Sequence, residues 1–509
     1  MTAVHSSTAL TIPDSRVQEL ESEVRRLELQ VKDLKNQLYG KKSERYAQVG
    51  GPNNLEFFAD PTAALEVPSP VNSVPRAPKK TAIPKGPKPL DPALPRELVK
   101  VEDPALRDLI CPVTGRVMQI GFVERLEVLQ RKPAEWFVRA MERNVFVSPA
   151  KSAPVYSEWP SNVLPRSRVH TSVVAFVAAQ HFCEHQPYFR IEKALERVGV
   201  DLPRACQVSL MNQLDERMKP LVDAIQKNVL ASGYVQLDAT PIDLCDPARP
   251  GVVREATLWA YRAVEGAVWF QFQLSKSPTH PQAVLVNSNY KGLLQTDGAS
   301  GFAQLGLEGQ VTHLGCFAHC RRYFFKAVKA CDPQAQIYLD DLNRLFRLDR
   351  LAAHFRLTPE NRQRLRNNYS LPLFQRLVSR AEADTPKVPP TTDLGKAFHY
   401  LLAQKPSLER CVANAQARLS NNLVENAVRP LKLGAKNWLQ IGHPNAGPRL
   451  AHLFTLVENC RQEGVDPETF LIDVIARLPD YPMKRIAELL PRQWKLAHVR
   501  PAGAHVAVA

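Results

Sequence analysis

The stretch GYVQLDATPIDL, residues 233–244, decides how this chain is expected to fold. An apolar run carries Asp238 to the end of a predicted strand, and Pro241 is expected to block regular pairing directly after it. The stretch GLLQTDGASG, residues 292–301, repeats the arrangement with Asp297. The pattern therefore predicts two strands that each deliver a carboxylate to their end.

A third acid, Glu425, lies in NNLVENAVRPLKLG, residues 421–434, which has the pattern of a helix start. Two acids on strand ends and one on a helix can hold two divalent cations about 3.5–4 Å apart, which stabilise the attacking and leaving oxygens of an in-line phosphoryl displacement. That is the chemistry of cutting and joining nucleic acids. Each acid also has a structural interpretation, Asp238 and Asp297 as turn residues and Glu425 as the partner of Asn422 in a capping box.

The apolar patterns around these acids predict a third region, residues 233–445, that is an α/β unit. A hairpin that turns at Glu265-Gly266 and a short helix are expected between the two acidic strands, and a further strand and a basic helix after them. This is the order of a ribonuclease-H-like mixed sheet. Residues 332–415 lack strand patterns and predict a helical insertion. The stretches concerned are ATLWAYRAV (256–264), AVWFQFQL (267–274), PQAVLVNS (281–288), VTHLGC (311–316) and HCRRYFFKAVKA (319–330).

Length and charge indicate a multidomain protein with a polyanionic partner. The chain has 509 residues and a formal net charge of +15, and domains commonly hold about 150 residues. Its nine cysteines are widely spaced, which favours a reducing cytosol over a disulfide framework. The first residues lack the pattern of a secretion signal, and the most apolar stretch, residues 171–180, is shorter than the roughly 20 residues that a membrane helix needs. We therefore expect a cytoplasmic protein without a membrane partner.

The N-terminal region, residues 14–48, has the heptad pattern of a coiled coil. Valine at a and leucine at d favour two parallel strands, so we expect a homodimer or higher oligomer, while a single amphipathic helix remains the alternative. Residues 49–97 are rich in proline and lysine and predict an extended linker. The heptad residues are Val17, Leu20, Val24, Leu27, Val31, Leu34 and Leu38.

Two further regions separate the linker from the acids. Residues 98–165 alternate short apolar runs and predict a small β region. Residues 166–232 are helical by periodicity, and the stretch ERVGVDLPRACQ, residues 196–207, breaks them into a helix-turn-helix-like arrangement that can place a helix in a major groove. An ordinary helical connection explains the same pattern. In the DNA-binding interpretation the base or phosphate readers are Arg204, Gln207, Ser209 and Gln213.

Several separated segments together resemble the IS66 family of DDE transposases. They occur in the order of the family and cover most of the chain. The leading heptad helix, YGKKSER (39–45) and LPREL (94–98) share the likeness, as does MKRIAELLP (483–491) near the end. The signatures are LDATP (237–241), LQTDGASGF (294–302), GCFAHCRRYFF (315–325), NNLVENAVRPLKLGAKNWLQIG (421–442) and HLFTLVENCRQEGVDPETFLIDVIARL (452–478).

The resemblance implies a ribonuclease-H-like core in which Asp238, Asp297 and Glu425 are catalytic and bind two Mg²⁺ ions, for which Mn²⁺ can substitute. Mg²⁺ is a hard ion that suits carboxylates. It further implies a transposase that binds the terminal inverted repeats of its element and catalyses cleavage and strand transfer of double-stranded DNA. A C-terminal helical region, residues 446–495, and a tail, residues 496–509, complete the expected organisation.

Two departures from the family pattern lie beside the acids. Family members usually carry a glutamate directly after the first catalytic aspartate, where this chain has Ala239, and an aspartate before the paired asparagines, where it has Ser420. These losses leave two alternatives open beside the active transposase. One is a ribonuclease-H-like nuclease without strand transfer, and the other is a catalytically decayed copy that binds DNA as a repressor.

The second region also departs from the family, which usually has two Cys-x-x-Cys pairs there. This chain has only Cys111, and four thiolates are the usual structural zinc set, so we expect a degenerate zinc-finger-like region without zinc. A second group of possible ligands, in residues 313–320, occupies a segment where the family has a Cys-x-x-His element. Packing and hydrogen bonding are the favoured interpretation of that group, which consists of His313, Cys316, His319 and Cys320.

Basic side chains near the acids favour a shared DNA-cutting site over three unrelated structural roles. We expect them to contact DNA in a nucleoid-associated bacterial protein, with small accessory proteins encoded by the same element as further candidate partners. They are Arg321, Arg322, Arg429, Lys432 and Lys436.

Overall fold

The structure is a computed structural model of the chain, which divides into two units, residues 1–89 and residues 90–509. Only the second unit is described here. The predicted coiled coil at 14–48 and most of the linker at 49–97 lie outside the described residues. Those residues are 90, 92, 94–101, 110–111, 114–132, 135–147, 153–157, 169–246, 248–249, 251–298, 311–330 and 332–498.

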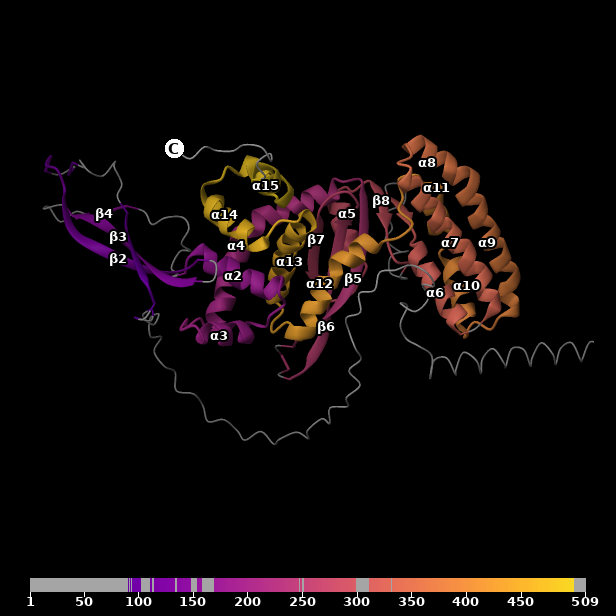
Figure 1. Ribbon diagram of the computed structural model, residues 1–509, viewed down its shortest axis with the longest axis horizontal. Helices are drawn as coiled ribbons and strands as arrows, with labels where there is room; N and C mark the ends of the chain where they lie inside the picture. Colours follow the sequence, from indigo (N-terminus) through magenta and orange to yellow (C-terminus); the bar gives the residue numbers. More distant parts are fainter. Residues whose placement is uncertain are drawn as a thin grey trace, which may run out of the picture. The chain divides into compact units, whose positions relative to one another are not determined.

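A five-stranded mixed sheet forms the centre of the second unit (Figure 1). The strand order is β7-β6-β5-β8-β9; β5 is antiparallel to β6 and β6 to β7, whereas β5/β8 and β8/β9 are parallel. The predicted hairpin, short helix and later strand are all present, so the predicted order of elements is confirmed. The bounds are β5 Tyr234–Cys245, β6 Val253–Ala263, β7 Val268–Gln273, α5 Thr279–Asn287, β8 Gly292–Gln295 and β9 Val311–Leu314.

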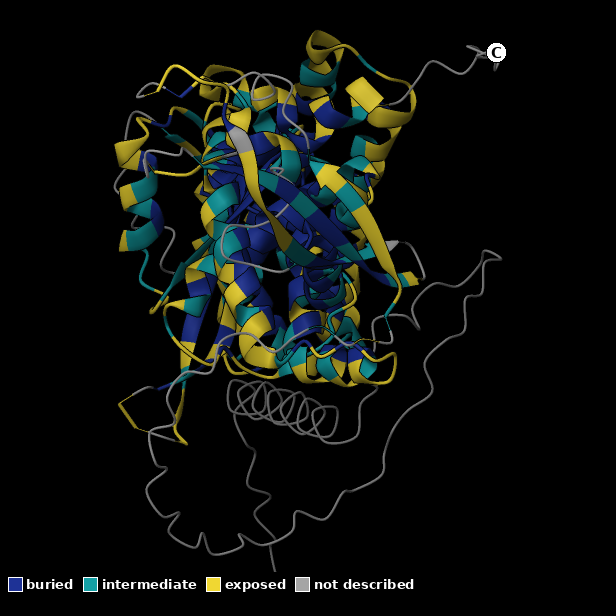
Figure 2. Cartoon of the chain, turned by 90° about the vertical axis from the view of Figure 1, so that its left-hand side faces the viewer, coloured by how far each residue is buried: buried dark blue, intermediate teal, exposed yellow. Residues whose placement is uncertain are grey.

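The sheet is buried because helices from both sides of the sequence cover it. In β6 every residue from Ala256 to Tyr261 is buried, so both faces of the strand are covered. Figure 2 shows buried residues gathered in the interior of the second unit and exposed ones toward its outside. Among the helices that contact these strands are α4 (Arg204–Leu230), α12 (Asn422–Trp438) and α13 (Ala446–Glu463).

Helix α13 also protects the free edge of the sheet. The Asn459 side chain donates to the carbonyl of Val268 and accepts from its N–H, at 2.7 and 3.0 Å. Thr455 Oγ1 accepts from the N–H of Phe270 at 3.0 Å. These side chains satisfy backbone groups of β7 that an edge strand would otherwise expose.

The prediction that Pro241 ends the first acidic strand is wrong. β5 continues through Pro241 to Cys245 and stays paired with β6, Pro241 lying opposite Thr257. Pairing with β8 extends only to Gln236. Beyond Gln236, the edge of β5 that faces β8 is no longer paired with that strand. On this edge the N–H of Cys245 donates to the carbonyl of Ile441. The backbone nitrogen of Pro241 points to the same edge, because residues an even number apart on a strand have the same orientation. Its missing N–H therefore points to a flank without a paired strand among the described residues, where proline is tolerated.

Helices between β9 and α12 form a second hydrophobic core, which contains Phe324, Tyr338, Phe374 and Phe398. Arg366 is fully buried at a π-helical turn and ties this bundle together. Its guanidinium donates to the carbonyls of Cys411 and Ala417 and to Asp349, at 2.8–2.9 Å. The elements are α6 Phe317–Lys329, α7 Pro333–His354, α8 Pro359–Leu365, η3 Arg366–Ser370, α9 Leu371–Asp384, η4 Thr385–Lys387, α10 Asp393–Ala403 and α11 Lys405–Ala413.

The N-terminal part of the unit holds a second mixed sheet, in which β3 pairs with β1 in parallel and with β2 and β4 antiparallel. Helices before and after the central sheet share one hydrophobic core with it. The fold is thus a mixed α/β one, and no helix within the described residues has the length and apolar character to cross a membrane. The remaining elements are β1 Arg96–Val101, β2 Gln119–Lys132, β3 Glu135–Val147, β4 Val155–Tyr156, α2 Thr171–Phe182, α3 Tyr188–Glu196, α14 Pro467–Arg477, η5 Leu478–Asp480, η6 Met483–Leu489 and α15 Pro491–His498.

Replacing Arg366 with methionine is expected to lower the free energy of unfolding by about 3–5 kcal/mol, because the change leaves buried carbonyls without donors and Asp349 without its most buried partner. Arg362→Met is the matched control, since Arg362 also pairs with Asp349 but its side chain is 26% exposed, against 2% for Arg366. The Arg362→Met variant should lower the free energy of unfolding by about 1 kcal/mol or less. Equal losses in urea unfolding would contradict this role of Arg366.

Candidate active site

The three acids predicted to share a site come from three elements and lie close enough to influence one another. Asp238 is on β5, Asp297 follows the end of β8, and Glu425 is in the first turn of α12. The pKa of Asp238 is raised to about 6, first by burial and then by the negative charges of Asp297 and Glu425. The N–H of Ala239, which donates to Asp238, and the charge of Lys432 oppose this rise. The acids therefore form one electrostatic group.

The turn that carries Asp297 is held from two directions. On one side Thr296 Oγ1 hydrogen bonds with His313 Nε2 of β9 at 2.8 Å. On the other, Tyr400 of α10 donates its hydroxyl to the Asp297 carbonyl at 2.6 Å, and Gln404 donates to the Gly298 carbonyl at 3.1 Å. The helical bundle thus fixes the backbone of an acid from the sheet.

Gly298 is suited to this turn for two reasons. Its φ of +83° lies in the left-handed region that favours glycine. A Cβ at this position would also come within 2.8 Å of the Gln404 side chain. The turn therefore needs glycine both for its conformation and for the close approach of the bundle.

Glu425 is not engaged in capping its own helix. The N-cap residue is Asn421, whose side chain makes no capping hydrogen bond within the described residues. Glu425 Oε1 is buried and likewise finds no hydrogen-bond donor in the described part of the chain. Two basic side chains lie within 4 Å of the carboxylate: His319, whose pKa is lowered by burial, with Nε2 3.6 Å from Oε1, and Arg322, with Nη2 3.7 Å from Oε2. The capping-box interpretation of Glu425 is therefore wrong.

The donor set of this group suits a hard divalent cation, although its side chains do not converge as ligands. Among the described residues, no group of three or more histidine, cysteine, aspartate or glutamate side chains is placed to hold a metal ion. The chemistry nevertheless fits, because Glu425 Oε1 is a buried oxygen that accepts no hydrogen bond from any described residue. Asp238 is also repelled by the other two acids. A bound cation would relieve both costs.

Helix α12 continues from Glu425 as a stripe of basic side chains. Arg429, Lys432 and Lys436 follow Glu425 at helical spacings of four, three and four residues and are all exposed. Lys432 is near enough to Asp238 to lower its pKa. The stripe therefore leads from the acidic group along one face of a helix.

The other predicted DNA contacts have mixed placements. Arg322 lies beside Glu425, whereas Arg321 donates to Asn343 Oδ1 of α7 at 2.8 Å. Arg204, at the start of α4, is exposed and pairs with Glu192 at 3.2 Å.

The prediction that Gln207 reads DNA is wrong. Gln207 is 0% exposed and donates to the carbonyls of Leu202 and Tyr188, at 2.9 and 3.3 Å. It therefore stabilises the connection between α3 and α4. Gln213, on the same helix, is half-buried.

The cysteine and histidine group next to the acids is integrated into the core. Cys316 and Cys320 are both 0% exposed, and burial raises the pKa of Cys316 to about 11. Cys316 Sγ accepts from the N–H of Asn421 at 3.5 Å. His313 is bound to Thr296, as described above. These contacts are the packing and hydrogen bonding expected from the sequence.

Sequence reasoning missed the residues that hold the acids in place. Tyr400 and Gln404 have no recognisable sequence signal, since they lie 103 and 106 residues after the backbone groups that they bind. Gln236 and Gln295 did carry a signal, because each precedes a candidate acid by two positions, in QLD and QTD. Residues two apart on a strand face the same way, so the repeat marks one side of the sheet.

Comparison with known proteins agrees with this arrangement. Residues 166–449 match the family described as Transposase IS66 family. The chain belongs to the IS66 transposase family. Residues 455–492 match the IS66 C-terminal element, and residues 26–99 match a region described as Transposase C of IS166 homeodomain. The matches to this family thus extend over most of the chain.

Relatives of this IS66-family protein occur in Sinorhizobium fredii (strain NBRC 101917 / NGR234). The uncharacterized protein y4hP is 26% identical over 430 residues, which cover 79% of this chain and 76% of the relative. The uncharacterized protein y4qI is 26% identical over 389 residues, covering 73% and 71%.

Replacing Asp238 with asparagine is expected to stabilise the metal-free protein above pH 6. The folded pKa of about 6 lies above the ordinary 3.8, so the stability associated with the protonated carboxyl is present below about pH 4 and lost as pH rises through 6. Each pKa unit corresponds to about 1.4 kcal/mol, so the gain should be roughly 1–3 kcal/mol. Thermal unfolding at pH 4 and pH 7.5 measures it, and an equal shift at both pH values would refute the assignment.

Proposed function

We propose that this protein is an active DDE transposase, which cleaves the ends of its element and transfers them to target DNA with Mg²⁺ or Mn²⁺ as cofactor. The single observation that carries the proposal is the placement of the three acids, Asp238 on β5, Asp297 after the parallel neighbour β8, and Glu425 in the first turn of α12, which contacts β5. Three carboxylates that repel one another in a protein of this family are best explained as ligands for cations. The family match supports the same reaction class.

The order and directions of the strands support a ribonuclease-H-like core. Three antiparallel strands are followed by two parallel ones, and the acids lie on the central strand and after its parallel neighbour. Helix α12 then presents the third acid after the bundle. In this proposal residues 233–445 are the catalytic domain and the bundle is its insertion.

The three carboxylates would hold the divalent cations, which supply a Lewis acid for the attacking and leaving oxygens of DNA. Partial burial of Asp238 and the buried Oε1 of Glu425 would limit the waters that compete for the ions. Arg322, 3.7 Å from Glu425, would balance part of the negative charge of the acids and contact a phosphate. The departures at Ala239 and Ser420 leave all three acids in place.

The basic stripe of α12 offers a path for the DNA backbone next to the acids. Arg429, Lys432 and Lys436 are exposed along one helix face and would neutralise successive phosphates. Arg321, Arg204 and Gln213 are proposed as further contacts. A role in binding the inverted repeats is assigned to the helical region of residues 166–232, and dimerisation to the heptads of residues 14–48. We place this activity on DNA in the bacterial cytoplasm.

Replacing Asp238 or Glu425 with alanine should abolish Mg²⁺-dependent cleavage of DNA that carries the element's ends, while DNA binding persists. Removing one ligand of a metal pair removes the stabilisation of the reacting oxygens, so we expect a loss of about 10³-fold or more. Asp243→Ala is the matched control, because Asp243 is an exposed acid on the same strand. Wild-type-like cleavage by either variant would overturn the assignment.

The same reaction separates transposition from simple nuclease activity. Joining of labelled donor ends to a target plasmid is the product expected of a transposase. Cleavage without joined products would favour the nuclease alternative. DNA binding with neither product would favour the decayed copy.

Replacing Lys432 with alanine should weaken DNA binding without a change in sequence preference and reduce the salt dependence of log K by about one unit of slope. A side chain that pairs with a single phosphate has this effect because it releases one set of counterions. Lys484→Ala, at an exposed lysine of η6, serves as the control. An unchanged slope for the Lys432 variant, measured by anisotropy at several salt concentrations, would remove α12 from the proposed path.

A further inference from the structure

Two buried glutamines lie side by side on neighbouring strands, close to the acids in sequence. Gln236 of β5 and Gln295 of β8 are paired in the parallel register and are both 0% exposed. Gln236 precedes Asp238 by two residues, and Gln295 precedes Asp297 by two. A buried amide must use its hydrogen-bonding capacity, so the partners of this pair show what it holds.

Gln236 connects the sheet to the start of α12. Its Nε2 donates to Gln295 Oε1 and to the carbonyl of Ser420, both at 2.8 Å. Its Oε1 accepts from the N–H of Val424 at 3.3 Å. Val424 directly precedes Glu425, and the helix has no side-chain cap of its own among the described residues. The sheet therefore supplies the missing cap of the helix that carries the third acid.

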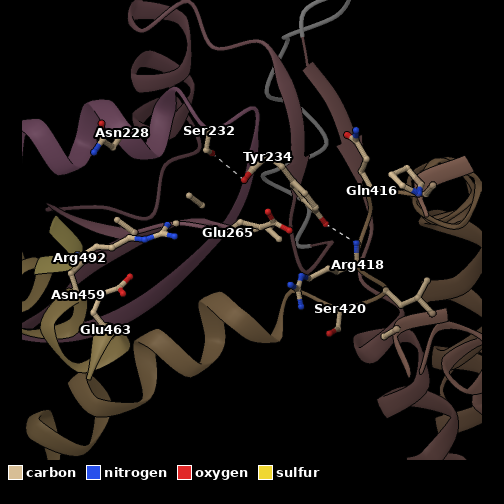
Figure 3. Close-up of a pocket in the computed structure, with 18 of the residues that line it drawn as sticks. Asn228, Ser232, Tyr234, Glu265, Gln416, Arg418, Ser420, Asn459, Glu463 and Arg492 are labelled. Atoms are coloured by element: carbon tan, nitrogen blue, oxygen red, sulfur yellow. Dashed lines mark hydrogen bonds between the residues drawn. The ribbon is translucent and has the colours of Figure 1, made fainter. Parts of the chain in front are cut away.

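Gln295 binds the segment that returns from the helical bundle. Its Nε2 donates to the carbonyls of Arg418 and Gly315, at 2.7 and 3.0 Å. Its Oε1 also accepts from the Tyr234 hydroxyl at 2.9 Å, and that hydroxyl in turn accepts from the N–H of Arg418 at 3.0 Å. Figure 3 shows Tyr234 reaching Arg418 at the wall of a cavity of about 860 Å³. The return segment is thus fixed at two successive points before α12 begins.

We propose that Gln236 and Gln295 are positioning residues that set Glu425 relative to Asp238 and Asp297. The proposal rests on the proposed function of the three acids as metal ligands. Such ligands must be held within about 0.5 Å of their productive places. Between Asp297 and Ser420 the chain passes through β9 and the whole helical bundle, so local sequence cannot provide that accuracy. A buried hydrogen-bond network in which every polar group has a partner can provide that accuracy, because its geometry has few alternatives.

A purely stabilising role for these amides makes a different prediction, and Asn459 provides the comparison. Asn459 is 4% exposed and ties α13 to β7 through both polar atoms of its amide. It resembles the glutamines in burial and in joining a helix to the sheet, but it does not bind the segment that carries Glu425. Asn459→Leu should therefore destabilise the fold without disturbing the acids.

The test compares Gln236→Leu, Gln295→Leu and Asn459→Leu in the full-length protein. Mn²⁺ alone is titrated and followed by electron paramagnetic resonance, and amide hydrogen exchange is measured over residues 422–428. Each glutamine variant should raise the Kd for Mn²⁺ by about 10- to 100-fold and speed exchange over residues 422–428 by about tenfold or more. Asn459→Leu should change both by less than about threefold.

Wild-type Mn²⁺ affinity in both glutamine variants would overturn the proposal, as would an equal weakening by Asn459→Leu. If a leucine variant does not fold, methionine at the same position, which has a similar length but no amide, replaces it in both measurements. If the three acids do not bind metal, the measurements give a different result. In that case Asp238→Ala would bind Mn²⁺ as the wild type does, while exchange over residues 422–428 would still report whether the glutamines hold α12.

Discussion

The closeness of Asp238 to two other carboxylates is the constraint on which the rest of this structure depends. Burial and the charges of Asp297 and Glu425 raise the pKa of Asp238, so the group is destabilising in the absence of a cation. A chain without support would let the side chains move apart. Each acid is instead carried by a rigid element or a fixed turn, and neighbouring segments hold its backbone.

The helical bundle supplies much of that support. Tyr400 and Gln404 bind the backbone of the Asp297 turn, and the segment that leaves the bundle is tied to the sheet through Gln236 and Gln295. Buried Arg366 makes the bundle rigid by linking α7, η3 and the return segment. An insertion of this length would ordinarily loosen the site, because closing a long loop costs entropy. The bundle has its own hydrophobic core, and this core and the contacts with the sheet restrict the conformations of the inserted segment.

Local patterns were enough to predict the strands, the hairpin, the basic helix and the placement of Asp297 and Glu425 on a strand end and a helix start. These features depend on alternation and turn chemistry within a few residues. The continuation of β5 through Pro241 was not predictable, because it depends on where a neighbouring strand stops. Burial of Gln207 depends on which face of α4 meets the core. The contacts of Tyr400 and Gln404 join residues about a hundred positions apart, beyond the reach of any local pattern.

The position of helix α13 near the end of the chain affects the stage of synthesis at which the candidate site can form. Its side chains satisfy the edge of β7, and its apolar residues belong to the same core as the sheet. Synthesis reaches this helix only after β5, β8, the bundle and α12 have all been made. A nascent chain on the ribosome therefore lacks the last layer of its core until translation is nearly finished. Synthesis of α13 and of the helices after it therefore determines when the core around β5, β8 and α12 is complete.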